Sequence, residues 1–542
     1  MSIITQPDPI ACTSIREYEY CPRKYYFDRY GDCKSPISLS RVEMTQKSRD
    51  RFLELNPLAQ VLEKEFISSP EVGLESTVEV VRMDQGYFIA HFRYGVPSKE
   101  GLWPGDKLQA TAELYLSGQL GRCFSGSLFF NVTDDSLVIF VPTEEDYGRL
   151  KRVVEEMSGK DDAEVPPPPL VDSQRCIPCE VAGLCLPDEV VMLREGNLDR
   201  QVRKVSPNDP RRPLYLSVQG SYVRKKGDRI QIEKQGEIVE SIRAFEVSQV
   251  CLFGAIGITT PLVNYLLSED IEIAHFSAGG WFYGLSTGFP HGNIELRRRQ
   301  FALAESGDIS LARSFVLGKI KNSRTLLKRN SRQKVENVLV RLAHGITQAE
   351  KAETQAELLG IEGSAARDYF GVFQSMLHPG SSEVPTEFRF TGRNRRPPLD
   401  PVNAMLSYLY AILIKDMTAI TFNIGLEPNL GYFHRPRYGR PALALDLSEE
   451  FRSIIADSVV VSLINRREIR VEDFIIHPFG VALTAEGRKK VLSGYERRLE
   501  TEVTHHLFNY TVTYRRIMDL QARLLAGYIL GDVPNYVPFM VR

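Results

Sequence analysis

The sequence predicts a multidomain protein: an α/β domain closed by clustered cysteines, then a small β-sandwich domain, then a mainly α-helical domain. First, a chain of 542 residues exceeds what one hydrophobic core can serve, because domains hold roughly 150 residues. Second, seven of the eight cysteines precede residue 190, so a ligand-binding cluster belongs to the first domain alone. Third, short strand-like runs in the middle give way to long helical periods after about residue 290.

The first domain is expected over residues 1–195. Residues 73–95 are rich in β-branched and aromatic side chains around an Asp-Gln-Gly turn, which predicts a hairpin. A helix is expected from Asp106, then two more strands and a second helix ending near residue 157. Four prolines at residues 166–169 favour a stiff extended segment that leads into the cysteine-rich run.

A linker is expected over residues 196–211, which are polar and lack apolar periodicity. Residues 212–288 contain short apolar runs between Gly and Asp turns, which is typical of a small β-sandwich. Residues 289–542 carry helical periods with few strand signals. These segments complete the expected three-domain order.

The net charge of -2 gives no hint of a polyanionic partner, so any nucleic-acid surface must be local. The N-terminus lacks a basic region followed by an apolar one, and no apolar stretch of about 18 to 20 residues is found. Eight cysteines are too few for a disulfide framework in so long a chain. We therefore expect a cytoplasmic protein with no membrane contact.

Three cysteines lie within ten residues, in the pattern Cys176-x2-Cys179-x5-Cys185, and Cys21 lies far upstream. Four thiolates can enclose one metal centre, and thiolates suit zinc and iron-sulfur clusters alike, so spacing alone leaves both open. Cys12 and Cys33 compete for the fourth position. The alternative is a set of buried cysteines without a ligand.

The run SIREYEYCPRKYYF, a helix containing Gln109 and the run RCIPCEVAGLCLP together resemble the CRISPR-associated RecB-like exonuclease family that carries a 4Fe-4S cluster. The resemblance covers about residues 10–190 and implies an α/β RecB-like nuclease fold. It favours an iron-sulfur cluster over zinc. The cluster ligands that it implies are Cys21, Cys176, Cys179 and Cys185.

The nuclease residues of that family are only partly retained. Glu79 stands where the family has Asp, His91 where it has Glu and Arg93 where it has Lys, and the helix over residues 41–55 lacks the family's metal-binding His. Glu79 and His91 could still hold a metal ion, but Arg93 stays protonated and cannot act as a base. We expect a degraded or inactive nuclease that keeps a DNA-binding role; plain polar hairpin residues are the alternative.

A carboxylate and histidine constellation marks the C-terminal half. Glu362 is followed by Gly363 in a helical pattern, and a glycine inside a helix suggests close approach of another chain segment. His434 lies on a Gly- and Pro-bounded loop, and Asp446 and Glu449 share one helix face. Oxygen ligands with one imidazole favour Mg or Mn over zinc. Solvated helix acids and a packed loop histidine are the alternative.

Basic residues gather around these acids. Residues 293–334 contain 11 basic residues against three acidic ones. A second stretch and the His434 loop add further arginines, which we expect to bind DNA phosphates: Arg389, Arg393, Arg395, Arg396, Arg435, Arg437 and Arg440. A solvated charged face is the alternative.

The runs GIEGSAARDYF, FRFTGRNRRPPLDPVNAMLSYLY and GYFHRPRYGRPALALDLSEEFR resemble the CRISPR adaptation integrase family, and the match extends over about residues 212–542. The resemblance implies that Glu362, His434 and Glu449 hold Mn or Mg, with Asp446 a possible further ligand. It also implies insertion of prespacer DNA into the CRISPR repeat as part of antiviral defence. The implied partners are double- and single-stranded DNA, a second copy of the chain and a small ferredoxin-like adaptation subunit.

The chain is thus interpreted as a fusion in which the N-terminal domain selects or trims prespacer ends for the integrase. The alternative function is a general metal-dependent DNA repair nuclease that acts on branched DNA. In that alternative the N-terminal half is a non-catalytic DNA-binding module.

Overall fold

The computed structural model describes residues 9–30, 39–83, 86–94, 101–118, 123–158, 165–197, 199–203, 210–288, 293–378, 385–394 and 397–541. The chain divides into two compact units, Met1–Pro187 and Asp188–Arg542. Helix α7 (Pro187–Glu195) was expected to belong to the first domain. In the structure its side chains form hydrogen bonds with residues of the second unit. There the Tyr510 hydroxyl donates to Glu189 Oε1 at 2.8 Å and Arg194 Nε donates to the carbonyl of Asp532 at 2.7 Å.

The first unit is built on one mixed sheet with strand order β1-β3-β4-β5-β6, and β2 pairs with β3. Its strands are β1 Ile10–Ala11, β2 Gln60–Ser69, β3 Leu74–Met83, β4 Gly86–Arg93, β5 Phe124–Asn131 and β6 Ser136–Phe140. Its helices are α1 Cys12–Tyr20, α2 Pro22–Tyr30, α3 Leu39–Leu55, α4 Pro104–Ser117, α5 Glu144–Ser158 and α6 Ala182–Cys185. The α/β character predicted for this region is confirmed.

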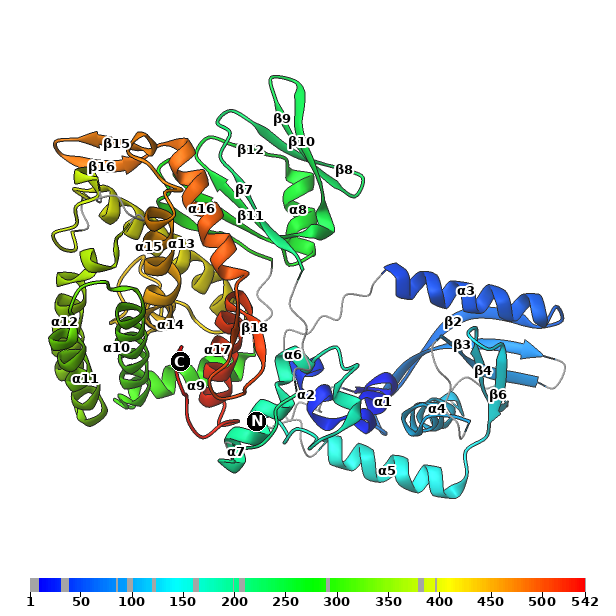
Figure 1. The fold of residues 1–542 in the computed structure, drawn as a ribbon. Helices are drawn as coiled ribbons and strands as arrows, with labels where there is room; N and C mark the ends of the chain where they lie inside the picture. Colours follow the sequence, from blue (N-terminus) through cyan, green and yellow to red (C-terminus); the bar gives the residue numbers. More distant parts are fainter. Residues whose placement is uncertain are drawn as a thin grey trace, which may run out of the picture. The chain divides into compact units, whose positions relative to one another are not determined.

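The predicted hairpin is confirmed, because β3 and β4 pair antiparallel with Met83 opposite Gly86; Asp84 and Gln85 lie outside the described residues. Alternate residues face opposite sides of the sheet, as strand geometry requires. Val80 and Ile89 pack with α1, α4 and α5, whereas Phe88 packs with Phe52 of α3. Figure 1 shows α3 and α4 on opposite sides of these strands.

The helical stretch predicted around Cys21 is two helices, because the chain leaves the helical conformation at that residue. Cys21 has φ -166° and ψ 117° and is followed by Pro22 at the start of α2. A residue that precedes proline is pushed out of the helical region by the proline ring. The break therefore places Cys21 at the junction of α1 and α2.

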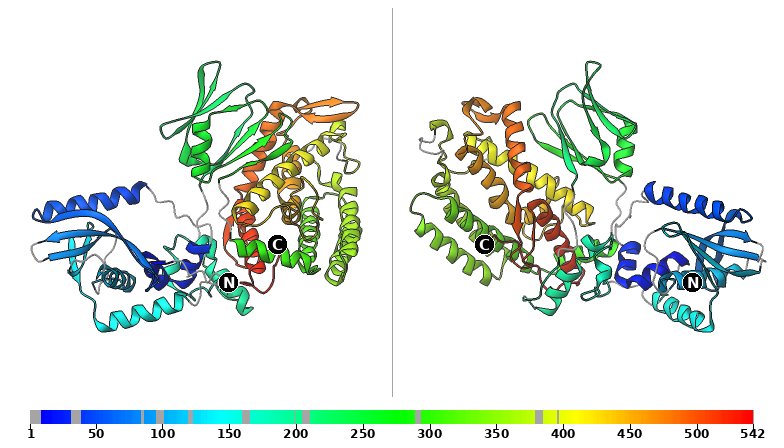
Figure 2. Two further views of the ribbon diagram at one scale, coloured as in Figure 1. Left: turned by 180° about the vertical axis from the view of Figure 1, so that it is seen from behind. Right: turned by 45° about the vertical axis from the view of Figure 1, so that its right-hand side comes forward.

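The β domain of the second unit consists of two four-stranded sheets, ordered β10-β9-β8-β12 and β14-β13-β11-β7. The strands are β7 Arg212–Leu216, β8 Tyr222–Lys226, β9 Arg229–Lys234, β10 Glu237–Arg243, β11 Val247–Phe253, β12 Gly257–Ile258, β13 Glu272–Phe276 and β14 Phe282–Ser286. Both sheets contribute to one core, into which helix α8 (Thr260–Ser268) also packs. The sandwich thus contains a helix that the strand pattern did not predict, and β11 pairs in parallel with β7 and β13 (Figure 2).

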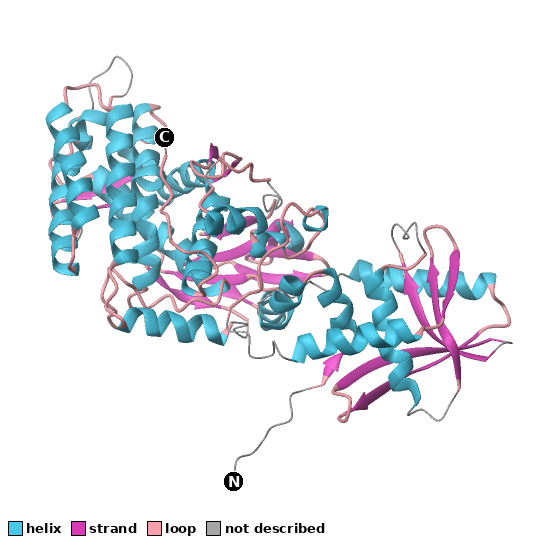
Figure 3. Cartoon of the chain, turned by 90° about the horizontal axis from the view of Figure 1, so that it is seen from below, coloured by secondary structure: helices cyan, strands magenta, loops and turns pink. Residues whose placement is uncertain are grey.

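The rest of the second unit is mainly helical, as predicted (Figure 3). Its helices are α9 Ile294–Glu305, α10 Ser310–Asn330, α11 Glu336–Lys351, α12 Gln355–Gly371, α13 Pro401–Asn423, α14 Ala442–Phe451, α15 Ser458–Asn465, α16 Ala485–Leu499 and α17 Tyr514–Ile529. Two short hairpins were not predicted: β15 Phe474–His477 with β16 Gly480–Leu483, and β17 Glu502–Thr504 with β18 Thr511–Thr513. Their strands have only three or four residues, too few for a clear two-residue period.

Helix α13 is the central helix of this unit. Its length and mean hydropathy of 1.3 are those of a membrane-spanning helix, which the sequence analysis did not find, but 56% of that segment is buried inside the folded unit. Its Lys415 is fully buried and donates to Gln249 Oε1 of the β domain at 2.8 Å. This contact ties the β domain to the helical one.

A π-helical turn, Arg452–Asp457, joins α14 to α15. The wider turn inserts residues into an otherwise continuous helix, a feature that recurs at functional sites. It carries two charged residues, the half-buried Arg452, which contacts Glu449, and the buried Asp457.

Candidate metal centres

Glu362, His434 and Glu449, far apart in the chain, converge in the second unit. Glu362 comes from α12, Glu449 from α14 and His434 from the loop between α13 and α14. Lys319 of α10 lies between the two carboxylates: its Nζ donates to Glu362 Oε1 and lies 2.7 Å from Glu449 Oε2. His434 Nε2 lies 3.8 Å from Glu449 Oε1. Glu449 therefore lies next to His434 on one side and to Lys319 on the other, and Lys319 links it to Glu362.

Asp446 fixes the histidine. Its fully buried carboxylate accepts the backbone N–H groups of Tyr432, Phe433 and His434 at 2.6 to 2.9 Å. It also lies 2.7 Å from His434 Nδ1. A carboxylate offers about four lone-pair positions, and four donors fill them. We therefore assign Asp446 to positioning rather than to the ligand role expected from the sequence: an Nδ1–H donated to Asp446 leaves the Nε2 lone pair facing Glu449.

Glu449 is buried yet held in its charged form. Burial opposes its ionisation, but Arg452, and to a smaller extent Lys319, outweigh burial and lower the pKa of Glu449 to about 2. The guanidinium of Arg452 lies 3.2 Å from Glu449 Oε1. In contrast, 20% of the Glu362 side chain is exposed, so the site is open to solvent on that side. An ionised buried carboxylate beside an accessible one suits cation binding.

A second group of polar residues supports Arg452. Its guanidinium lies 5.0 Å from the centre of the Tyr410 ring. The Tyr410 and Tyr369 hydroxyls donate to Asp457 at 2.7 and 2.9 Å. Burial raises the pKa of Asp457 to about 6. The sequence analysis missed Lys319 as a site residue, along with Arg452 and Asp457, because no spacing links them to Glu362.

The donor set fits a hard divalent ion. Two carboxylates and one imidazole nitrogen are ligands that Mg²⁺ or Mn²⁺ accepts. Within the described residues no three His, Cys, Asp or Glu side chains, the cysteines included, are grouped so as to hold a metal ion as they stand. At this site Lys319 Nζ lies between Glu362 and Glu449. The same two carboxylates thus already bind one cation.

No other segment of the described chain approaches Gly363 closely, so the prediction of a close approach at this glycine is wrong. A Cβ atom at Gly363 would meet nothing within 4 Å, and the residue is exposed. Glycine and Glu362 are adjacent on α12 and therefore point about 100° apart around the helix axis. The small neighbour faces solvent while the carboxylate faces Lys319.

The predicted DNA-binding arginines fall into two groups. Arg435 and Arg437 are exposed on the His434 loop, and Arg389 is exposed beside the buried Phe388 and Phe390. Arg440 is half-buried, and burial lowers its pKa. Two further predicted residues, Arg395 and Arg396, lie outside the described residues.

Arg393 has a structural role instead. Its guanidinium donates to Asn403 Oδ1 at 2.7 Å and Ser407 Oγ at 3.1 Å, and lies 5.3 Å from the Tyr410 ring centre. These contacts anchor the loop that precedes α13. Arg393 is thus half-buried against its own chain rather than presented to DNA.

The cations of the basic stretch over residues 293–334 also fall into two groups. Several of its cations bind neighbouring carbonyl or carboxylate groups: Arg297, Arg298, Arg299, Arg313, Lys319, Lys321 and Arg324. The exposed cations gather at and after the C-terminal end of α10: Lys328, Arg329, Arg332 and Lys334. The expected continuous basic face is thus reduced to this end of the helix.

In the first unit the four predicted cluster cysteines line one cavity. Cys21, Cys176, Cys179 and Cys185 surround it together with apolar groups that include Leu170. Arg23 Nε donates to Cys185 Sγ at 3.1 Å, and burial raises the pKa of Cys185 to about 12. Four sulfur atoms on one enclosed, apolar cavity are the ligands that an iron-sulfur cluster or zinc would need.

Of the two cysteines expected to compete for the fourth position, Cys12 does not line this cavity. Cys12 is buried in the core between α1 and the sheet, where burial raises its pKa further than the neighbouring Glu113 does. Cys123 is exposed, and Cys33 lies outside the described residues. Among the described cysteines, Cys21 is therefore the one that joins the triplet.

The hairpin residues do not form a shared metal site. Glu79 faces α3, where Arg49 Nε lies 3.3 Å from its Oε1. His91 faces α4, where its Nε2 lies 3.2 Å from Glu113 Oε2, and Arg93 on the same face lies 3.2 Å from Asp106. The expectation that Glu79 and His91 hold one metal ion is wrong, because the two side chains lie on opposite faces of the sheet.

The His91 pair is closed off from solvent. The side chains of His91 and Glu113 are 6% and 3% exposed. Glu113 also accepts from Gln109 Nε2 at 2.9 Å and Ser76 Oγ at 3.0 Å. Burial opposes ionisation of Glu113, but His91 outweighs it and lowers the pKa of that carboxyl. Both hydrogen bonds go to Oε1, whereas Oε2 has only the His91 ring beside it.

Residues 214–497, slightly more than half of the chain, match the family described as CRISPR associated protein Cas1. A CRISPR-associated exonuclease Cas4/endonuclease Cas1 fusion from Geobacter sulfurreducens is 38% identical over 489 residues, covering 88% of this chain and 87% of the relative. A protein of the same description from Leptospira interrogans is 31% identical over 544 residues, covering 96% and 99%.

Two solved structures share the fold of the second unit. A Cas1 protein from Thermotoga maritima has a TM-score of 0.52 at 23% identity and covers 61% of this chain and 100% of its own. A casposase bound to integration product has a TM-score of 0.52 at 22% identity, covering 60% and 92%. By the extent and identity of its match to the curated relatives, the chain belongs to the family of CRISPR-associated exonuclease Cas4/endonuclease Cas1 fusions.

Proposed function

We propose that this chain inserts short DNA into a CRISPR repeat, in the cytoplasm, and that Glu362, His434 and Glu449 hold the Mn or Mg ion of the reaction. The observation that carries the proposal is the convergence of these residues on Lys319, with Glu449 held ionised at neutral pH. The names of the relatives, which describe an endonuclease, support it.

In the proposed reaction a DNA 3′-hydroxyl attacks a phosphodiester of the repeat and forms a new phosphodiester. The bond from that phosphorus to the 3′-oxygen of the repeat strand breaks, and the leaving oxygen takes up the proton that the attacking hydroxyl gives up. A bound divalent ion would neutralise charge on that phosphate and favour deprotonation of the hydroxyl. Asp446 holds the His434 ring with Nε2 towards Glu449, and Arg452 keeps Glu449 charged. Arg435 and Arg437, exposed on the same loop as His434, bind the phosphates on either side.

The proposed partners are double-stranded prespacer DNA with single-stranded ends, the CRISPR repeat, a second copy of this chain and a small ferredoxin-like adaptation subunit. The casposase of similar fold, described as bound to an integration product, is consistent with a DNA substrate. The exposed cations near the site provide the charge that such a substrate needs.

The proposal is tested by strand transfer in vitro. The full chain is purified with its adaptation subunit and mixed with labelled prespacer DNA, Mn²⁺ and a plasmid that carries a repeat. We expect Glu362→Gln to lower strand transfer about 1000-fold, since a metal ligand contributes several kcal/mol. Glu353→Gln, at an exposed acid just before the same helix, is the matched control. Full activity of Glu362→Gln would exclude the proposal, and equal cutting of branched DNA without a repeat would favour the repair nuclease.

We propose further that Cys21, Cys176, Cys179 and Cys185 hold a 4Fe-4S cluster. The support is the shared, apolar cavity and the N–H donated by Arg23 to Cys185 Sγ, since hydrogen bonds to ligand sulfur stabilise such clusters. The cluster would tie the α1–α2 junction to the cysteine-rich segment after residue 170 and so close the domain.

Metal analysis of protein purified without oxygen separates the two candidate metals. We expect about four iron and four sulfide per chain with a brown colour, as the cluster type requires. Cys179→Ala should lose most of the iron, and Cys123→Ala, at an exposed cysteine outside the cavity, should keep it. A colourless wild-type protein that carries one zinc would contradict the cluster.

The N-terminal unit is proposed to bind DNA without cutting it. The observation that favours this is the closed network in which His91, Gln109 and Ser76 all engage Glu113, while Glu79 lies on the other face. The full chain carrying Glu449→Gln, which silences the other site, is given single-stranded overhangs and Mn²⁺. We expect no trimming; trimming that disappears in Glu79→Ala would show an active exonuclease.

A further inference from the structure

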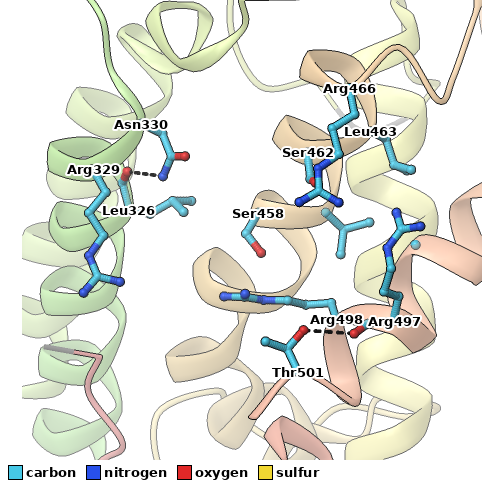
Figure 4. Close-up of a pocket in the computed structure, with 12 residues that line it drawn as sticks. Leu326, Arg329, Asn330, Ser458, Ser462, Leu463, Arg466, Arg497, Arg498 and Thr501 are labelled. Atoms are coloured by element: carbon cyan, nitrogen blue, oxygen red, sulfur yellow. Dashed lines mark hydrogen bonds between the residues drawn. The ribbon is translucent and has the colours of Figure 1, made fainter. Parts of the chain in front are cut away.

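A cavity of about 530 Å³ lies between α10, α15 and α16 and belongs to neither centre described above. Arg329 enters it from α10, Arg466 from the end of α15, and Arg497 and Arg498 from the last turn of α16. Figure 4 shows the four guanidinium groups arranged around the hydroxyls of Ser458 and Ser462. Among the described residues that line the cavity, none is an Asp or Glu.

Some of this charge is compensated nearby. Arg497 donates to Glu468 Oε2 at 2.6 Å, and Arg466 lies 3.9 Å from the other oxygen of that carboxylate. One acid therefore serves two arginines, and Glu468 stands outside the lining of the cavity. The described lining of the cavity itself carries four arginines and no carboxylate.

Arg498 is held in place by its own chain. Its Nε donates to the carbonyl of Ile454 at 2.8 Å, its other nitrogen donates to the Tyr514 hydroxyl at 3.1 Å, and its guanidinium lies 4.3 Å from that ring centre. Burial lowers the pKa of Arg498, and repulsion from Arg329 acts in the same direction. Two cations that repel each other across a cavity are costly to the fold, which is typical of a binding site rather than of a structural contact.

Helix ends do not account for the arrangement. A basic residue in the last turn of a helix favourably offsets the helix dipole, which explains Arg329 or Arg497 taken singly. It does not explain why side chains from three helices face one cavity, nor why Ser458 and Ser462, one turn apart on α15, face the same space. The Ser458 hydroxyl already donates to the carbonyls of Ile454 and Ile455, so the arginines are the main donors here. Guanidinium forks are the groups that bind phosphate.

The cavity also has an apolar wall and room for a ligand larger than a single ion. Leu326, Val459, Leu463 and Gly494 form an apolar wall beside the arginines. A volume of about 530 Å³ is in the range of small-molecule sites and exceeds what one phosphate group fills. In a bound nucleotide the phosphate would contact the arginines, and the sugar and base would pack against the apolar wall.

We propose that this cavity is a second phosphate site, which binds the phosphate group of a nucleotide. Arg329 lies ten residues beyond Lys319 on α10, which corresponds to roughly 15 Å along the helix. The cavity is therefore separate from the carboxylate and histidine site, and the proposal stands whether or not that site carries out integration. The nucleotide comes either free from solution or as part of a DNA strand.

Binding is measured on the full chain with EDTA present, so that the carboxylate site takes no part. The probes are dTMP, thymidine, orthophosphate and a five-residue oligo-dT, each followed by calorimetry. We expect dTMP to bind and thymidine not to bind, because the phosphate is what the arginines recognise. Tighter binding of oligo-dT than of dTMP would identify a DNA strand as the source, and equal binding a free nucleotide.

The variants are Arg329→Gln and Arg466→Gln, both at exposed side chains. Each is expected to weaken dTMP binding about tenfold, as loss of a charge-assisted hydrogen bond does. Lys328→Gln is the matched control, since it makes the same charge change on the neighbouring residue of α10, outside the cavity. It should change binding less than twofold.

The proposal is overturned if thymidine binds as well as dTMP, if no phosphate probe binds at millimolar concentration, or if Lys328→Gln weakens binding as much as the cavity variants do.

Discussion

Each of the two units contains a buried carboxylate beside a histidine, but the surroundings of the two carboxylates differ. In the second unit Glu449 faces His434, Lys319 and Arg452, and its neighbour Glu362 reaches solvent. In the first unit Glu113 faces His91 and accepts from Gln109 and Ser76 at one oxygen, and the side chains of Glu113 and His91 are almost completely buried. Neighbouring groups lower the pKa of both carboxyls, yet only the first arrangement leaves a ligand accessible to solvent.

The difference shows that ligand identity alone does not make a metal site. What separates the two regions is where the remaining lone pairs point. Asp446 takes the Nδ1 side of His434 and directs Nε2 into the site, whereas His91 Nε2 is itself directed at Glu113. Changing one group in each region tests whether this contrast is real.

The same substitution made in both regions should have the largest effect. Glu449→Gln is expected to lower strand transfer about 1000-fold. It should also lower the melting temperature, because it breaks the buried pair with Arg452. Glu113→Gln should leave strand transfer within twofold but destabilise the first unit, since it breaks a buried ion pair. Strand transfer and differential scanning calorimetry on the same preparations measure both effects. If Glu113→Gln abolished overhang trimming, the first unit would be a nuclease after all.

Asp446→Asn should have the next largest effect. An amide cannot supply the four acceptor positions that Asp446 uses, so the His434 ring is less well fixed. We expect a 10- to 100-fold loss of activity together with a rise in the Mn²⁺ concentration needed for half-maximal rate. Asp368→Asn, an exposed-face acid paired with Arg341, is the control and should change neither quantity.

Glu450, next to Glu449, should control the pH dependence of stability. Burial raises the pKa of Glu450 to about 8, although Tyr536 and the Phe539 N–H donate to it. A carboxyl with a raised folded pKa contributes stability that is complete below its unfolded value of 4.5 and is lost as the pH rises through 8. Glu450→Gln should flatten the melting temperature between these pH values. An unchanged pH profile would show that the carboxyl is ionised in the folded protein.

Gly363→Ala should have the smallest effect. The added Cβ meets nothing within 4 Å, and alanine is favoured over glycine inside a helix by about 1 kcal/mol. We expect a slight rise in melting temperature and unchanged strand transfer. A loss of strand transfer with no loss of stability would mean that DNA approaches α12 closely at this residue.

Much of this architecture could be predicted from the sequence, because helical and strand periods are long in this chain. Four cysteines in one cavity, and the group of Glu362, His434 and Glu449, followed from motifs with a family resemblance. Lys319 could not be found in this way: it is 43 residues from Glu362, and only the packing of α10 against α12 and α14 brings its ammonium to the carboxylates.

The opposite orientation of Glu79 and His91 could be predicted from the hairpin register. Val80 pairs with Ile89, and continuing that register sets Glu79 opposite Ala90, so Glu79 and His91 must face opposite sides. The role of Asp446, by comparison, depends on three backbone N–H groups that a tight loop turns towards it. No pattern of side chains in the sequence encodes such a loop.

The π-helical turn at Arg452–Asp457 has a consequence for insertions and deletions. It lies between Glu449 and the serines Ser458 and Ser462 that face the arginine-lined cavity. Deleting one residue there would restore an α-helix and rotate everything beyond it by about 100° relative to Glu449. The length of this turn thus sets the rotation of Ser458 and Ser462 around the helix axis relative to Glu449. Members of this family should therefore tolerate substitutions in the turn far better than insertions or deletions.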